Sequence, residues 1–95
     1  MGHDITGYKG KVEVAYMFRG ATSELNKIIY EVLDSTDLYG ECSGEGTRKF
    51  NKEQLSAALS EIEKYYPDCD REIDFLKDCI KACDSKSSKI KIEFY

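Results

Sequence analysis

The sequence predicts an α+β fold, in which three helices pack on one face of a mainly antiparallel sheet of about four to five strands. Two observations support this fold class. Near both ends of the chain apolar side chains alternate with polar ones, which is the period of a strand. In the middle of the chain apolar residues recur at helical spacing. The 95 residues include one proline and no internal repeat, so we expect a single domain, residues 1–95, with the element order ββαββααβ.

The first two elements are expected to be antiparallel strands. Residues 12–19, VEVAYMFR, alternate between two sets of side chains, as in a strand with one buried face. Residues 5–8 are expected to pair with this strand through a tight turn at Lys9-Gly10. Gly20 then ends the second strand.

A helix is expected after Gly20, where Thr22 or Ser23 can accept hydrogen bonds from the first free amides. Its apolar residues fall on one face at helical spacing, and they are Leu25, Ile28, Ile29, Val32 and Leu33. The helix is expected to end within residues 34–37, which favour turns.

The glycine-rich residues 39–50, YGECSGEGTRKF, have two interpretations. Glycine adopts the positive φ angles of a turn, so residues 38–43 and 47–50 are expected to be the two short strands of a hairpin. The spacing G-x-x-x-x-G-K-[ST] of a phosphate-binding loop is absent, yet the basic pair in this segment precedes a helix start, where free amides attract anions. The alternative is therefore a loop that binds a small ligand or nucleotide through Ser43, Gly44, Gly46, Arg48 and Lys49.

Two further helices are expected before the last strand. Asn51 and Gln54 form a capping-box pair at the start of the first helix, and Pro67 ends that helix. Asp68 or Asp70 is expected to cap the second helix. The inward side chains of that helix are Ile73, Leu76, Ile80 and Cys83.

The chain closes with a predicted strand, KIKIEFY at residues 89–95. Its apolar side chains, Ile90, Ile92 and Phe94, share one face. Its lysines lie on the other face, which is typical of an edge strand or a solvated sheet face.

Charged residues are unevenly distributed along the chain. The formal net charge is −4, and residues 28–47 contain Asp and Glu but no lysine or arginine. Because contact with a nucleic-acid backbone needs clustered basic residues, we expect no direct nucleic-acid binding. Acidic faces instead attract a basic protein surface. The candidate partner-binding residues are Glu31, Asp34, Asp37, Glu61, Glu63, Tyr66, Asp70 and Asp74.

Cysteine and histidine indicate little chemistry. Cys79 and Cys83 lie one helical turn apart, so a structural zinc site is a second alternative to small buried thiols. His3 stands beside Asp4, a pairing that suits acid–base chemistry, but no nucleophile motif accompanies it. We expect His3 to be solvated or to hydrogen-bond locally near the terminus. No enzyme activity and no cofactor are expected.

The opening residues lack the basic and apolar regions of a secretion signal, and no apolar run approaches the ~18 residues that cross a membrane. The four cysteines, without a secretion signal, indicate a reducing compartment and free thiols. We therefore expect a cytoplasmic protein that does not bind membranes. The sequence leaves the oligomeric state and the order of strand pairing open.

Three stretches carry a resemblance to other proteins: the opening M-G-H-D-I-T-G-Y, Ile28-Ile29-Tyr30, and S-G-E-G-T-R-K-F at residues 43–50. In these the chain resembles a group of small proteins of bacterial, phage and mobile-element genomes that open M-G-x-D-I and carry an S-G-x-G segment. The group has no established catalytic residues, and its context implies binding and blocking of a host factor. We therefore expect a small acidic, non-enzymatic inhibitor, of the anti-defence or anti-CRISPR kind, that binds a basic surface of a nucleic-acid-handling host complex.

Overall fold

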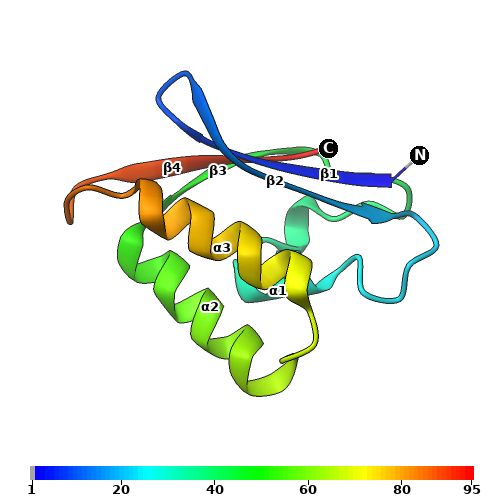
Figure 1. Ribbon diagram of the computed structural model, residues 1–95. Helices are drawn as coiled ribbons and strands as arrows, with labels where there is room; N and C mark the ends of the chain where they lie inside the picture. The colour runs from blue at the N-terminus through cyan, green and yellow to red at the C-terminus, as the bar shows by residue number, and fades with distance from the viewer. Residues whose placement is uncertain (1) are drawn as a thin grey trace.

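In the computed structural model, which describes residues 2–95, a four-stranded antiparallel sheet carries three α-helices on one face (Figure 1). The predicted fold class is confirmed, and the element order agrees with the predicted one except that a 3-10 helix, η1, stands between α1 and β3 in place of the first hairpin strand. The elements are β1 Gly2–Lys9, β2 Val12–Gly20, α1 Ile28–Val32, η1 Thr36–Leu38, β3 Gly46–Asn51, α2 Lys52–Tyr65, α3 Asp70–Ala82 and β4 Lys89–Phe94. No helix within the described part of the chain is long and apolar enough to cross a membrane.

The strands lie in the order β2-β1-β4-β3. The predicted pairing of the first two strands is confirmed, from Gly2 opposite Gly20 to Lys9 opposite Val12, and Gly10 in the connecting turn has a φ of 64°. The last strand, β4, is not an edge strand, because it lies between β1 and β3. The chain thus brings residues 46–51 and residues 89–94 side by side.

The alternation predicted for the strands decides which side chains enter the core. In β4, Ile90, Ile92 and Phe94 are fully buried beneath the sheet, as predicted. In β2, Ala15 and Met17 are buried beneath the sheet, while Tyr16 and Phe18 are 52% and 40% exposed on the opposite face. The sheet therefore has one face covered by helices and one open face that carries aromatic side chains.

Local signals determined the start and end of α2. The Asn51 side chain accepts a hydrogen bond from the Gln54 backbone amide, and the Gln54 side chain accepts one from the Asn51 amide, both at 2.8 Å. The predicted capping box is confirmed, and α2 ends at Tyr65, shortly before Pro67. At the start of α3, by contrast, Cys69 is the capping residue and makes no side-chain cap hydrogen bond, so the predicted aspartate cap is absent.

Two predicted elements differ from the structure. The helix predicted from Leu25 onward begins only at Ile28, because the side-chain amide of buried Asn26 donates to the carbonyls of Gly20 and Ala21 and holds a turn there. Residues 38–43, predicted as the first hairpin strand, are the end of η1 and a loop. Gly44 follows this loop where the chain passes close to the core, since a Cβ there would lie 2.7 Å from the Cβ of Phe94.

Candidate functional site

The residues of the predicted ligand loop do not converge on one pocket. Arg48 donates to both carboxylate oxygens of Asp37 at 2.9 and 2.8 Å and to the Ser35 hydroxyl at 3.2 Å. This pairing lowers the pKa of Asp37 and ties β3 to η1. Gly44 is buried beneath Tyr30 and Phe94, whereas Lys49 lies on the open face of the sheet. The segment is thus a packed connection, and of the predicted set Lys49 lines a surface hollow.

The acidic candidates from residues 31–37 lie around α1 and η1. Glu31 is exposed on α1, and Asp34 follows the helix with a φ of 52°. Asp34 lines a shallow hollow of about 250 Å³ with side chains of the first half of α2. Because Asp37 is held by Arg48, this group presents less free negative charge than its sequence indicates.

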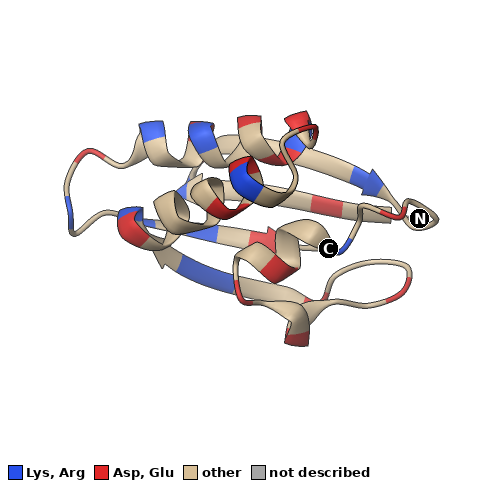
Figure 2. Ribbon diagram, turned by 90° about the horizontal axis from the view of Figure 1, so that it is seen from below, with Lys and Arg blue, Asp and Glu red and all other residues tan. Residues whose placement is uncertain are grey.

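The other acidic candidates surround the connection between α2 and α3. Here we define the acidic corner as the exposed residues Glu61, Glu63, Tyr65, Tyr66, Asp68, Asp70 and Asp74. Its two tyrosines are 63% and 37% exposed, so both project outward. Figure 2 shows the acidic residues (red) spread over the helical side of the molecule. The acidic corner combines carboxylates with exposed aromatic rings.

The cysteines are free thiols, and only Cys42 is exposed. Cys79 is fully buried, and burial raises the pKa of its thiol to about 12. The Cys83 thiol lies 3.5 Å from the Cys79 carbonyl oxygen as a hydrogen-bond donor. Within residues 2–95 no three His, Cys, Asp or Glu side chains are grouped to hold a metal ion. Both Cys79 and Cys83 belong to the buried core between the helices and the sheet.

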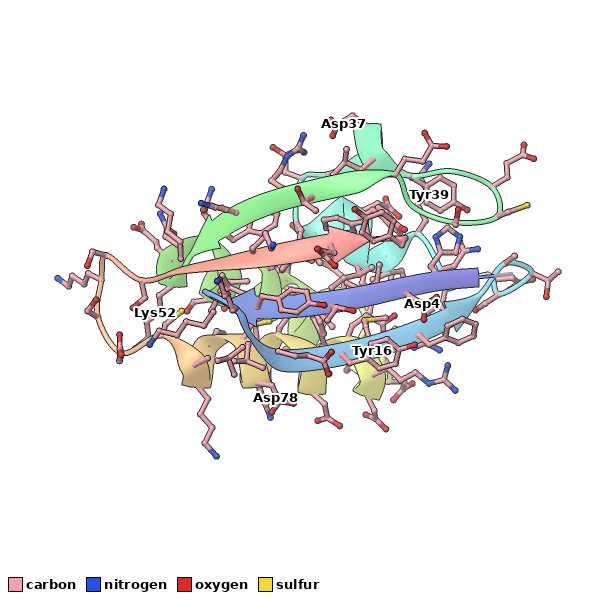
Figure 3. The ribbon with its side chains drawn as sticks, turned by 90° about the horizontal axis from the view of Figure 1, so that it is seen from above. Asp4, Tyr16, Asp37, Tyr39, Lys52 and Asp78 are labelled. Atoms are coloured by element: carbon pink, nitrogen blue, oxygen red, sulfur yellow. The ribbon has the colours of Figure 1, made fainter. Side chains whose placement is uncertain are left out.

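His3 does not pair with Asp4, because the two side chains leave β1 on opposite faces. Asp4 accepts a hydrogen bond from the Tyr16 hydroxyl on the open face, as Figure 3 shows. His3 is fully buried on the helical face, with its Nδ1 atom 2.7 Å from the Tyr30 hydroxyl and its ring stacked on Tyr39. The expectation of a solvated or locally bonded terminal histidine is wrong, since β1 pairing carries His3 into the core.

The structure also forms a basic surface that the sequence did not indicate. On the open face, Lys49 of β3 lies directly opposite Lys91 of β4. Together with Tyr8, Gly10 and Lys89 they line a hollow of about 200 Å³. The Lys91 ammonium lies 5.3 Å from the centre of the Tyr8 ring.

Further lysines surround this hollow. We define the lysine end as the β1–β2 turn, the β3–α2 junction and the start of β4, with Lys9, Lys11, Lys49, Lys52, Lys86, Lys89 and Lys91. Lys52, labelled in Figure 3, marks it. Carboxylates lie there as well: Asp84 pairs with Lys9, and Glu53 lines a second hollow with Lys52 and Lys86. The alternation of residues 89–92 placed two of these lysines on one face, but only the pairing order of the strands adds Lys49 and Tyr8.

The chain matches no family model, no curated protein and no solved structure in comparisons with each. Its function therefore has to be inferred from the chemistry of its own surfaces. The acidic corner combines charge with exposed aromatic side chains, and the lysine end combines charge with the half-buried ring of Tyr8.

Proposed function

We propose that this protein is a non-enzymatic, cytoplasmic interaction protein that binds a basic protein surface through its acidic corner. This proposal is based on the exposure of the carboxylates in the acidic corner and on their lack of ion-pair partners. Within the described residues, Glu61, Glu63, Asp70 and Asp74 are exposed and take part in no ion pair. Their charge is thus available to a partner, and four free thiols suit a reducing compartment.

The acidic corner has the two components of a protein-binding surface. Unpaired carboxylates accelerate the encounter with a basic surface and suppress acidic partners. Tyr66 and Tyr65 supply aromatic anchors, which are enriched among the residues that carry binding energy. The resemblance to small phage and mobile-element proteins supports a partner within a nucleic-acid-handling host complex, which the bound protein would inhibit.

The test compares wild type with the variant E61Q/E63Q/D70N/D74N, which keeps side-chain size and removes charge. Partners are captured from a host lysate and quantified by mass spectrometry, and the captured partner is then titrated at 50 to 300 mM salt. We expect the variant to bind at least about tenfold more slowly, with a flatter salt dependence.

The matched control is E24Q/E31Q/D34N/E45Q, which removes the same charge from a surface outside the corner. We expect it to retain capture. Equal capture by wild type and the corner variant, or equal loss in both variants, would exclude the acidic corner as the binding site.

A further inference from the structure

The open face of the sheet has no covering element. All three helices lie on the other side (Figure 1), and Figure 3 looks directly onto the uncovered strands. Tyr16, Phe18 and Tyr95 are 52%, 40% and 52% exposed. This face therefore offers aromatic rings on strands that the core holds rigidly in place.

The lysines of this face are arranged at a cost to the fold. Lys49 and Lys91 are directly opposed across neighbouring strands, and like charges in such pairs destabilise a sheet. The nearest compensating carboxylate is Glu93, whose oxygen lies 3.8 Å from the Lys91 ammonium. Lys49 and Lys89 form no ion pair within residues 2–95. A bound anion would neutralise this repulsion.

Aromatic side chains extend from the lysines across the sheet. Tyr8 lies opposite Lys91, and Tyr16 lies opposite Thr6, two residues along β1 from Tyr8. Tyr8 and Tyr16 are thus diagonal neighbours, with Cα atoms roughly 7–8 Å apart. Lysines beside the half-buried ring of Tyr8 and the exposed ring of Tyr16 match the two chemical parts of a nucleotide, because lysine binds phosphate and an aromatic ring stacks on a base.

We infer that the open face binds a short single-stranded nucleic-acid segment, with Lys49, Lys89 and Lys91 on its phosphates and Tyr8 and Tyr16 stacking on its bases. Lys11, Lys52 and Lys86 extend the positive potential around the hollow, whereas Lys9 is paired with Asp84. Carboxylates limit the bound segment to a few nucleotides, because Glu13 lies opposite Tyr8 and Glu93 lies beside Lys91. Asp4 accepts a hydrogen bond from the Tyr16 hydroxyl. The site is independent of the acidic corner, and it is contrary to the expectation from chain-wide charge that the protein does not contact nucleic acid.

Fluorescence anisotropy with labelled 12-nucleotide oligo(dT) and oligo(U) at 50 mM salt tests the inference. We expect K49Q/K91Q to bind at least about tenfold more weakly, with a log–log salt slope smaller by about 1.4, since each phosphate contact on a single strand contributes about 0.7. Tyr8→Leu should also bind roughly tenfold more weakly, as expected for the loss of one stacked base. The matched control K27Q/K77Q removes the same charge from exposed lysines of α1's N-terminal flank and α3, and should bind within about twofold of wild type.

Two companion measurements distinguish binding of a nucleic-acid strand from loss of folding and from general attraction of anions. Because K49Q/K91Q removes a like-charge pair together with the Lys91–Glu93 ion pair, its thermal midpoint should stay close to that of wild type, so weaker binding cannot be attributed to unfolding. Polyphosphate and an acidic peptide, used as competitors, should displace the oligonucleotide poorly. The inference would be overturned if 100 μM wild type gave no anisotropy change, or if the control variant lost as much binding as K49Q/K91Q. It would also be overturned if polyphosphate displaced the oligonucleotide as well as a nucleic acid does and Tyr8→Leu bound like wild type.

Discussion

At the scale of single residues, His3 shows how strand pairing changes the chemistry of a side chain. It is the only histidine of the chain, and β1 places it between Tyr30 and Tyr39. Its Nδ1 atom is hydrogen-bonded to Tyr30, but its Nε2 atom has no partner within the described residues. Burial lowers the pKa of His3, because the charged imidazolium is poorly solvated there.

This lowered pKa predicts a stability that falls on mild acidification. In the unfolded chain His3 takes up a proton near pH 6.5, whereas the folded protein takes it up only at lower pH. Between these two pKa values the unfolded state binds more protons than the folded state. The free energy of unfolding is therefore unaffected by His3 above about pH 6.5 and decreases below it. The slope for one proton is at most about 1.4 kcal/mol per pH unit.

Urea unfolding of wild type and His3→Gln at pH 5.5 to 7.5 measures this effect. We expect the free energy of unfolding of wild type to decrease as the pH is lowered across this range. The variant should be less stable than wild type at pH 7.5, but its stability should change less with pH. Identical pH slopes in the two proteins would show that His3 does not carry the dependence.

At the scale of elements, the features predicted correctly are those encoded locally. The Asn51–Gln54 capping box, the end of α2 before Pro67 and the alternation of β4 each depend on neighbouring residues, and each is present. The short α1 and the loop at Gly44 depend on contacts with distant parts of the chain. The lysine end was not predicted for the same reason, because Lys49 meets Lys91 only through the pairing of β3 with β4.

An ion pair between Arg19 and Glu72 joins β2 to α3. From composition alone, both charged residues would be expected at the surface. Glu72 belongs to an acid-rich stretch but is fully buried, and Arg19 is only 9% exposed. Arg19 donates from Nε to Oε2 at 2.8 Å and from Nη2 to Oε1 at 2.7 Å. Such forked pairs add directionality as well as attraction, so this one fixes how α3 crosses β2.

Glu72→Leu should therefore destabilise the fold by about 3–5 kcal/mol, since it leaves a buried guanidinium without its partner. The double variant R19L/E72L should recover much of this loss, because replacing both charges with apolar groups removes the unpaired charge. Urea unfolding provides the measurement, with exposed Asp78→Asn as a control expected within about 0.5 kcal/mol of wild type. A double variant that loses the sum of the two single losses would contradict this account.

At the scale of the whole molecule, the two ends of the helix pair differ in their excess charge, although Glu53 lies beside Lys52 at one end and Lys64 and Arg71 lie at the other. α2 begins at Lys52 in the lysine end and leads to the acidic corner, and α3 returns from the corner toward the lysine end. The 14 residues of α2 span about 21 Å. A molecule with a net charge of −4 thus presents a positive region and a negative region that two copies can bring together.

This polarity predicts attraction between molecules at low salt, where a uniformly charged protein of the same net charge would repel itself. Electrostatic reach is about 30 Å at 10 mM salt and about 8 Å at 150 mM, against a longest molecular dimension of 37 Å. In static light scattering we expect a negative second virial coefficient at 10 mM salt that rises toward zero or above at 150 mM. Two variants identify the contact: K49Q/K91Q and E61Q/E63Q/D70N/D74N should each weaken the attraction, whereas K27Q/K77Q should not. A positive coefficient for wild type at 10 mM salt would mean that net charge outweighs the difference between the two ends.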